Sequence, residues 1–536
     1  MEIKKEIFMK EIKELKFEEL TLEQKLGMVT VASIRTQEDF EYTLELVKKR
    51  AIGAVWILPY QDYKRGESQR ILKEAADYPL LFLADAESGM GSHLIGRQNA
   101  IGMTGSEELA YTFGKITAIE ARRYGVNVVG NPILDMVSAN AVCAATVRSI
   151  GGDKEKVAKL AAAIARGMHD GGVLTIGKHF PGKSPATAHL DEHMVETWSD
   201  ATVDELLEYN LYPYKYLIER DLLDGIMVEH TRFTKVDNDY PASLSKPVLD
   251  IARDKLNYKG FFVTDALEMF GIKTKFGQVR SRGLALSAGN ELILGWYGAK
   301  HDYEALAECY KNGEITDEQL DRAVKVVLET QHKTMMLPEI PEITEEDEKN
   351  FARINKDSIY QRADEGIPLS VDKNSKPLFV IVTSMETRND AGKLSMDTMT
   401  LHWYKPEKIA ARLEKEYPGC TVHAIKEYPT GGDIERVQSL VMDFDNVVLI
   451  TYFNSSAGIG RERFTPRLVS LIEALQVTNE INTLLYFGNP FVLEEIPHVD
   501  RLIIGPTSEM SVEAGLDVLA GDYPAKGFMT YDVKFK

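Results

Sequence analysis

The sequence predicts an α/β protein in which an N-terminal (β/α)8-type (TIM-like) barrel precedes a three-layer α/β/α sandwich domain. Between about residues 50 and 335, short apolar runs alternate with amphipathic helical stretches, and this alternation favours a parallel sheet. A Pro-rich, acidic stretch interrupts the pattern, which resumes near residue 377. We therefore expect a barrel over 1–335, a connector over 336–375 and the sandwich domain over 376–536.

The first region contains seven strand-like apolar runs, at 54–58, 80–83, 126–129, 173–176, 225–228, 261–263 and 292–294. Helical patterns, for example at 156–170 and 204–220, separate them. About seven βα units within about 280 residues fit a closed barrel better than an open sheet.

The second region has strand candidates at 378–382, 421–424, 447–451, 483–487 and 502–504, with helix candidates at 405–417 and 467–477. The Gly-Ile-Gly-Arg-Glu-Arg stretch at 458–463 resembles a phosphate-binding turn only loosely, and we favour a loop that precedes a helix. The acidic run at 345–348 is interpreted as a solvated face of the connector.

Composition excludes several classes of protein. The formal net charge of −19 over 536 residues argues against nucleic acid or an anionic membrane surface as the main partner. The three cysteines, at 143, 309 and 420, have neither metal-ligand spacing nor the density of a disulfide framework. The Lys/Glu-rich stretch 1–26 lacks the apolar core of a signal peptide, and no run approaches 18 apolar residues. We expect a cytoplasmic protein without a metal or organic cofactor, and its oligomeric state stays open.

Polar side chains come directly after five of the predicted barrel strands: Asp85, Asn131, Lys178-His179, Glu229-His230 and Asp265. The carboxyl ends of barrel strands open on one face, where active sites are built from several strand ends. This pattern predicts an active site on that face.

The Lys-His-Phe-Pro-Gly stretch at 178–182 is followed by Asp191 and His193. In an extended segment these last two side chains leave the same face, and a carboxylate beside an imidazole fixes its tautomer for proton transfer. The competing interpretation is a solvated loop with a chance histidine. His189 is the weaker proton-transfer candidate because it lacks an Asp two residues upstream.

Asp265 ends a buried apolar run, where a carboxylate can act as a nucleophile or a base. Alone, it could equally cap the next helix. Together with Asp191 and His193, it favours a paired catalytic site.

These motifs resemble glycoside hydrolase family 3 over nearly the whole chain. The matching stretches are Asp-Ala-Glu-Ser-Gly at 85–89, Pro-Ile-Leu-Asp at 132–135, Arg-Ser-Ile-Gly at 148–151, Pro-Ala-Ser-Leu-Ser at 241–245, Val-Thr-Asp-Ala-Leu-Glu-Met at 263–269 and Phe-Gly-Asn-Pro-Phe at 487–491. Lys-His-Phe-Pro-Gly followed by Asp-x-His is similar to the family's β-N-acetylglucosaminidase branch.

The resemblance implies that Asp265 is the nucleophile, that His193 is the general acid/base and that Asp191 orients it. It also implies a group of residues that hold the sugar: Asp85, Arg148, Lys178, His179 and His230. The chain departs from the family pattern in a longer stretch at 183–190, in Glu192 where Ser is frequent and in Met90 where many members carry Arg. These departures put leaving-group specificity in doubt more than the chemistry.

The implied activity is that of a retaining, exo-acting β-N-acetylglucosaminidase (a β-N-acetylhexosaminidase). It would act on small carbohydrate substrates such as muropeptide or chitin fragments, as in peptidoglycan turnover, through a covalent glycosyl-Asp265 intermediate. Three alternatives stay open: a β-N-acetylglucosaminide phosphorylase, a β-glucosidase of the same family, and an inactive sugar-binding protein.

Overall fold

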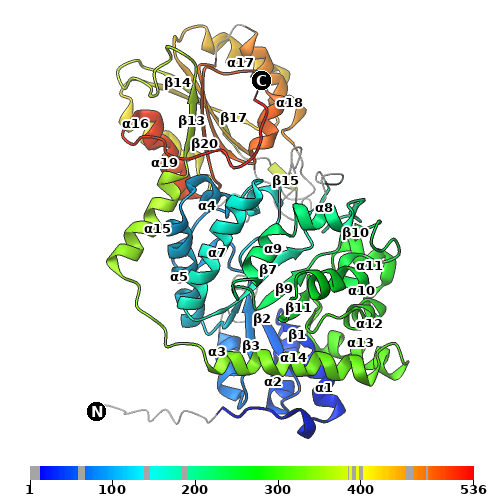
Figure 1. Ribbon diagram of the computed structural model, residues 1–536. Helices are drawn as coiled ribbons and strands as arrows, with labels where there is room; N and C mark the ends of the chain where they lie inside the picture. The colour runs from blue at the N-terminus through cyan, green and yellow to red at the C-terminus, as the bar shows by residue number, and fades with distance from the viewer. Residues whose placement is uncertain are drawn as a thin grey trace.

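The computed structural model describes residues 12–57, 67–137, 145–183, 187, 190–383, 386–388, 394–396, 403–453, 463–477 and 481–535. Cys143, His189 and residues 458–462 of the glycine-containing turn lie outside them. Figure 1 shows a barrel with a second α/β domain placed against one end of it.

Eight parallel strands form the barrel sheet, in the order β11-β9-β7-β6-β3-β2-β1-β12. They are β1 (Thr30–Ser33), β2 (Ala54–Ile57), β3 (Leu81–Ala84), β6 (Val128–Val129), β7 (Leu174–Phe180), β9 (Gly225–Val228), β11 (Phe261–Thr264) and β12 (Ile293–Leu294). A parallel bridge between Val263 and Leu292 joins the two ends of this order, so the barrel is nearly closed. The expected barrel is confirmed.

The strand β1 is the one barrel strand that the apolar pattern did not predict. Its sequence, Thr-Val-Ala-Ser, has a single large apolar side chain, yet all four residues are buried. Thr30 Oγ1 donates to the Leu26 carbonyl at 3.0 Å and Ser33 Oγ donates to the Gly295 carbonyl at 3.3 Å. These hydrogen bonds allow two hydroxyls to be buried, and they explain why hydropathy alone missed the strand.

Helices surround the barrel strands. The main ones are α1 (Leu22–Met28), α2 (Gln37–Lys48), α3 (Glu67–Ala75), α4 (Asn99–Thr104), α5 (Glu107–Arg123), α7 (Lys154–Asp170), α8 (Val203–Glu208), α9 (Tyr212–Ile218), α10 (Lys246–Asp250), α11 (Phe270–Phe276), α12 (Gln278–Ala288), α13 (Ala299–Lys311) and α14 (Asp317–Met335). The helix expected over 204–220 is wrong as one element, because α8 ends at Glu208 and α9 starts anew with Pro213 in its first turn. Proline fits a first turn but breaks a helix interior.

Alternate residues of the barrel strands face two different cores. In β2, Ala54 and Trp56 belong to the cluster inside the barrel, whereas Val55 and Ile57 pack with the surrounding helices. This is the period-2 alternation of a strand that is buried on both faces. Figure 1 shows α14 crossing the end of the barrel opposite the second domain, and Val327 of α14 packs into the interior cluster.

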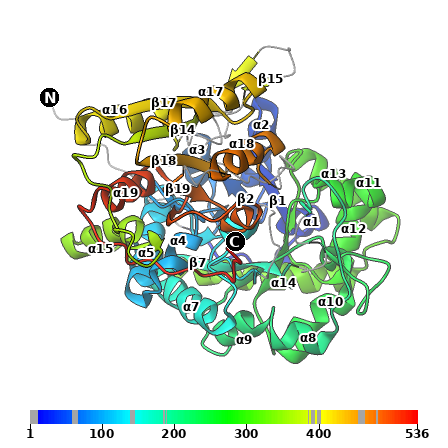
Figure 2. The same cartoon turned by 90° about the horizontal axis from the view of Figure 1, so that it is seen from above.

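The second domain is a six-stranded sheet in the order β13-β20-β19-β18-β14-β17, with β13 antiparallel to its neighbour β20. Its elements are β13 (Tyr360–Ala363), β14 (Leu378–Thr383), α16 (Pro406–Glu416), β17 (Thr421–Lys426), α17 (Gly431–Val441), β18 (Val447–Phe453), α18 (Pro466–Gln476), β19 (Thr483–Gly488), β20 (Arg501–Gly505) and α19 (Glu509–Ala520). Helices cover both faces, as viewed from above in Figure 2.

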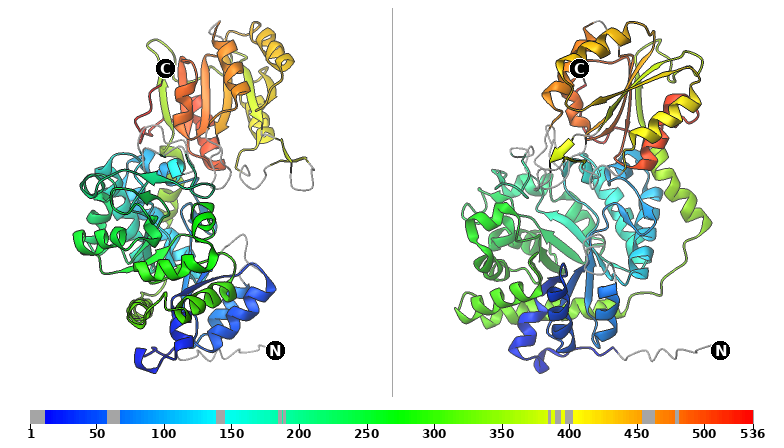
Figure 3. Two further views of the ribbon diagram at one scale, coloured as in Figure 1. Left: turned by 90° about the vertical axis from the view of Figure 1, so that its right-hand side faces the viewer. Right: turned by 180° about the vertical axis from the view of Figure 1, so that it is seen from behind.

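The two faces of this sheet have separate cores, as a three-layer sandwich requires. In β14, Leu378 and Val380 pack with α17 and α18, whereas Phe379 and Ile381 pack with α16 and α19. Between the two domains, the chain runs through α15 (Glu345–Asp357) (Figure 3). The strand β13 also lies within the segment expected to be a connector, but it is an edge strand of the second domain's sheet. The exact domain boundaries stay a prediction.

The C-terminal segment packs back onto the barrel rim. The Tyr531 hydroxyl donates to the Ser149 carbonyl at 3.0 Å, and the Gly152 N–H donates to the Thr530 carbonyl at 2.9 Å. The Phe528 N–H donates to the Met103 carbonyl at the end of α4. The second domain therefore contacts the backbone directly after Arg148. Within the described part of the chain, no helix combines the length and apolarity needed to span a membrane.

Candidate active site

An irregularity at the end of β7 presents two successive side chains to one site. The β7–β9 pairing is regular at Gly177 and shifts register before Phe180. In a regular strand, Lys178 and His179 would face opposite sides, and a bulge removes that constraint. Both side chains are almost fully buried, and both contact charged groups at the barrel rim.

Lys178 and Arg148 share one buried carboxylate, Glu87. The Lys178 Nζ lies 2.8 Å from Glu87 and also pairs with Asp85, which is 47% exposed. Arg148 forms a bidentate ion pair with Glu87, in which Nε donates to Oε2 at 2.9 Å and Nη2 donates to Oε1 at 2.7 Å. Burial would raise the pKa of Glu87, but Arg148, Lys178 and Arg97 together hold it well below its usual range.

The tautomer of His179 follows from its two neighbours. Arg148 has only donors, and its Nη2 lies 3.0 Å from His179 Nε2, so this ring nitrogen accepts. The Nδ1–H then donates to Asp135 at 2.7 Å. Asp135 also accepts the backbone N–H of His179 at 3.2 Å. The orientation of the His179 ring is therefore fixed by contacts at both of its nitrogens.

Asp265 follows β11 and lies beside three imidazoles. Its Oδ1 accepts the N–H of Ala266 at 2.7 Å, and its Oδ2 lies 3.9 Å from His179 Nε2. Burial would raise the pKa of Asp265, but the surroundings, with His179, His230 and His193 first among them, lower it further than burial raises it. The carboxylate is therefore ionised over the ordinary pH range, as a nucleophile must be.

His230 is held by hydrogen bonds at both ring nitrogens. Its Nε2 donates to the carbonyl of Ala266 at 3.0 Å, and its Nδ1 accepts from the Ser243 hydroxyl at 2.8 Å. Burial lowers the pKa of His230, although the Asp265 carboxylate and the Ala266 carbonyl oppose this shift. Because Ala266 follows Asp265 directly, these contacts fix the backbone that carries the carboxylate.

Asp191 and His193 form the expected pair. His193 Nδ1 lies 2.8 Å from Asp191 Oδ1, which also accepts the backbone N–H of His193 at 3.0 Å. The imidazole is 31% exposed. Burial lowers the pKa of His193, but Asp191, Glu192 and Asp265 raise it more, so the net shift is upward.

The loop that carries His193 is joined to the segment that follows Asp265. The N–H of Phe270 donates to the His193 carbonyl at 3.3 Å. A side chain at Gly271 would lie only 3.0 Å from the Val195 carbonyl, so glycine permits this close approach. His193 and Asp265 are also near enough for each to shift the pKa of the other.

The eight predicted site residues thus lie on one connected part of the barrel rim. Sequence reasoning gave no role to several others that hold them in place: Glu87, Arg97, Asp135, Lys183, Glu192 and Glu229. Glu87 and Asp135 stand inside the quoted motifs at 85–89 and 132–135, which was an available signal. The partners of the other four residues depend on the tertiary fold.

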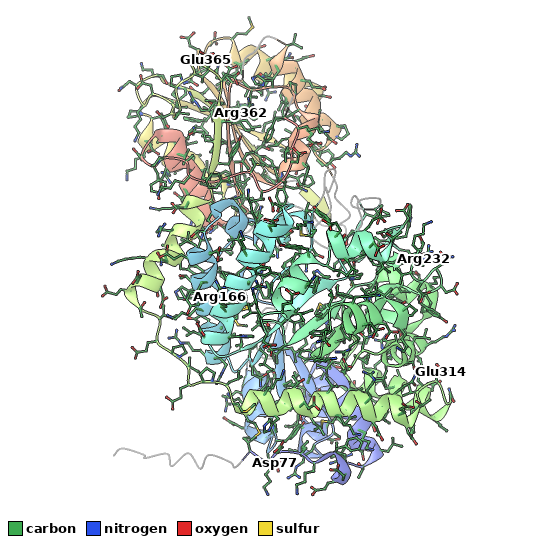
Figure 4. All side chains as sticks on the ribbon, in the orientation of Figure 1. Asp77, Arg166, Arg232, Glu314, Arg362 and Glu365 are labelled. Atoms are coloured by element: carbon green, nitrogen blue, oxygen red, sulfur yellow. The ribbon has the colours of Figure 1, made fainter. Side chains whose placement is uncertain are left out.

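One group in the described residues brings three possible metal-ligand atoms within 4.8 Å of one another: Asp364, His498 and Asp500. It lies in the second domain, where Figure 4 labels the neighbouring Arg362. Asp364 already pairs with Arg362 at 3.1 Å and with His498 at 2.6 Å. These contacts make it an ion-pair network on the far domain, remote from the barrel rim.

Comparisons with known proteins agree with this geometry. Residues 21–330 match the model of the glycosyl hydrolase family 3 N-terminal domain. A relative named beta-hexosaminidase from Haemophilus influenzae is 30% identical over 270 residues, which is 48% of this chain and 73% of the relative.

Among solved structures, a family 3 beta-N-acetylglucosaminidase from a Paenibacillus species is 27% identical. It superposes with a TM-score of 0.77 over 96% of this chain and 100% of its own. A beta-glucoside phosphorylase, BglX, is 24% identical with a TM-score of 0.79, over 96% of this chain and 95% of its own. The second likeness shows the fold alone. The family-model match over more than half of the chain establishes that it belongs to glycosyl hydrolase family 3, and with its relatives it identifies the chain as a glycoside hydrolase.

Proposed function

We propose that the protein is a retaining, exo-acting β-N-acetylglucosaminidase. The observation that carries the proposal is the 2.8 Å contact of His193 with Asp191, in a loop whose backbone is bonded to the segment after Asp265. The names of the Haemophilus and Paenibacillus relatives support N-acetylhexosamine as the sugar. We further propose small β-linked GlcNAc glycosides of the muropeptide or chitin type as substrates, cleaved in the cytoplasm.

In the first step, Asp265 Oδ2 attacks the anomeric carbon, since Oδ1 already accepts the Ala266 N–H. The bond between that carbon and the leaving oxygen breaks, and protonated His193 gives its Nε2 proton to the oxygen. The products of this step are a glycosyl-Asp265 ester and neutral His193.

In the second step, neutral His193 takes a proton from water, and the resulting oxygen attacks the anomeric carbon and releases Asp265. Asp191 holds the imidazole in one tautomer and stabilises its charged form, as the acidic member of a catalytic triad does. Asp85, Lys178, Arg148 and His179 would bind sugar hydroxyls, and their mutual contacts fix them in advance. Of the four, Asp85 is the one with an extensively exposed side chain.

Trapping the intermediate tests this proposal. A fluorinated N-acetylglucosamine donor should label the wild-type protein on the peptide that contains Asp265, and Asp265→Asn should block both labelling and turnover. Labelling of that peptide in the Asn variant would contradict the role of Asp265. Parallel rates on aryl GlcNAc and aryl glucose decide the sugar, and absence of both labelling and hydrolysis would indicate an inactive sugar-binding protein.

The phosphorylase is a second candidate because the acid/base is an imidazole. A carboxylate base would repel inorganic phosphate, whereas the raised pKa of His193 favours its cationic form. Turnover measured with and without phosphate separates the two. A sugar-1-phosphate product with a large phosphate-dependent gain in rate would identify the phosphorylase, and a rate independent of phosphate would identify the hydrolase.

A further inference from the structure

Glu192, between the two residues of the acid/base pair, is turned into the protein. Its side chain is 8% exposed, and its carboxylate contacts the ammonium of Lys183, which is also largely buried. Both residues belong to the departures from the family pattern noted in the sequence. The structure pairs these departures with each other.

The Lys183 ammonium has a second buried partner. It lies 2.9 Å from Oε2 of Glu229, the residue that follows β9. Lys183 itself is fixed at the end of the β7 segment, where the Asn210 side chain donates to its carbonyl at 3.1 Å. One cation therefore joins three segments: the end of β7, the acid/base loop and the end of β9.

The far end of the acid/base loop is tied to the same place. The Thr231 hydroxyl donates to Glu229 Oε2 at 2.8 Å, and the Thr197 hydroxyl donates to that of Thr231 at 2.9 Å. The N–H of Arg232, a residue labelled at the edge of the barrel in Figure 4, donates to the Thr197 carbonyl at 3.0 Å. Residues 191–197 are thus joined to residues 229–232 directly at Thr197 and, through Lys183, at Glu192.

The charges within this cluster are unequal. Burial raises the pKa of Glu229 to about 8, and Lys183 offsets only part of that rise. Burial would lower the pKa of Lys183, but Glu192 and Glu229 hold it well above its usual value. The ammonium therefore stays charged between two carboxyl groups, of which Glu229 resists ionisation because it is buried.

We propose that Lys183, Glu192 and Glu229 form a positioning cluster that holds His193 where it can reach the leaving-group oxygen. The inference rests on the proposed function, since it requires His193 to be the acid/base. Lys183 does not touch the substrate in this scheme and acts only through His193.

A double-mutant cycle tests the proposal on the full chain. Lys183→Met, His193→Ala and the double variant are assayed on two GlcNAc glycosides, one with an alkyl leaving group and one with a dinitrophenyl leaving group. Lys183→Met should slow the alkyl substrate by roughly 10- to 10³-fold, because that leaving group needs protonation. The dinitrophenyl substrate should change by less than about threefold in its glycosylation step, because its leaving group departs without an acid.

Adding Lys183→Met to His193→Ala should cost little more, since a residue that acts through His193 then has nothing to position. Lys115→Met is the matched control, because Lys115 pairs with Asp347 at 2.8 Å and joins α5 to α15. It should leave both rates unchanged. Equal slowing of both substrates by Lys183→Met, or full additivity with His193→Ala, overturns the cluster and leaves His193 as the acid/base. If His193→Ala leaves the rates on both substrates unchanged, the proposed function itself is overturned.

Glu192→Gln is a second variant, which tests the positioning cluster even if Lys183→Met does not fold. It keeps an oxygen for the Lys183 ammonium and removes one charge beside His193. That charge contributes to the raised pKa of His193, so the basic limb of kcat/KM should move to lower pH. A basic limb of kcat/KM that stays at the wild-type pH or moves to higher pH contradicts the proposal.

Discussion

The two sides of the active site are held by different means. The proposed sugar-holding side is made by residues that follow β3, lie at the end of β7 or pack on these ends: Asp85, Glu87, Arg148, Lys178 and His179. Its charges are paired within about 3 Å. The acid/base side is a loop, and its imidazole is 31% exposed. In the proposed mechanism, sugar recognition is therefore built into the barrel, whereas proton transfer depends on contacts that anchor a loop.

The largest effect should come from breaking the sugar-holding side at Glu87. Glu87→Ala leaves Arg148, Lys178 and Arg97 without their common carboxylate, so the free energy of unfolding should fall by about 3–5 kcal/mol. Urea denaturation measures this loss. Glu74→Ala, which removes an exposed pair with Arg70, should cost less than about 1 kcal/mol. An equal loss of unfolding free energy in Glu87→Ala and Glu74→Ala would show that the buried carboxylate matters no more than an exposed one.

The stability of the wild type should also depend on pH through Glu87. Because its folded pKa lies below the unfolded value of about 4.5, its contribution is present above that pH. The contribution is lost as pH falls through the folded pKa. The decline below about pH 4.5 should therefore be smaller in Glu87→Gln than in the wild type, as followed by urea midpoints across the acid range.

Substitution of His193 should lower the catalytic rate without lowering the stability of the fold. His193→Ala should lower kcat on alkyl and sugar leaving groups by roughly 10²–10⁴-fold, with little change in the urea midpoint. His332→Ala, which removes a half-exposed histidine paired with Glu14, is the control and should leave kcat unchanged. A comparable loss in His189→Ala, with His193→Ala active, would move the acid/base to position 189.

The pH dependence of kcat/KM should show how strongly Asp191 acts on His193. His193 must be protonated to donate, and its raised pKa places the basic limb of kcat/KM above pH 6.5. Asp191→Asn removes a raising contribution, so its limb should lie at lower pH. The raised pKa also means that His193 stabilises the fold below pH 6.5 and loses this effect as pH rises through the folded pKa. A basic limb that is identical in the two proteins would exclude the pairing.

The smallest effect should come from the second domain. Tyr531→Phe removes the hydroxyl that donates to the Ser149 carbonyl, next to Arg148, at a cost of about 1 kcal/mol. KM should rise a few-fold while kcat stays near the wild-type value, since the sugar-holding side alone is affected. Tyr523→Phe loses a hydroxyl bonded to Asp357 and is the control. A fall in kcat with unchanged KM would show that the contact serves another purpose.

The sequence by itself determined the fold class of the two domains, and it predicted where the active site lies. Apolar runs with polar residues after them are local signals, so seven barrel strands and residues such as Asp265 could be predicted from them. His193 could be predicted from its spacing to Asp191. The motif resemblance added roles. The apolar pattern did not predict β1, because this strand buries hydroxyl side chains. It also predicted one helix over 204–220, where Pro213 stands in the first turn of a second helix.

The tertiary structure alone decided which charges meet. Glu87 and Arg148 are 61 residues apart, and Lys183 reaches Glu229 across 46 residues, so no local pattern reveals either pair. Burial then sets their energetics, because a charge without solvent depends on its nearest partner. Chain order gives the identity of each group, but the packing of the β3, β7 and β9 ends gives each group its partner, its protonation state and its tautomer.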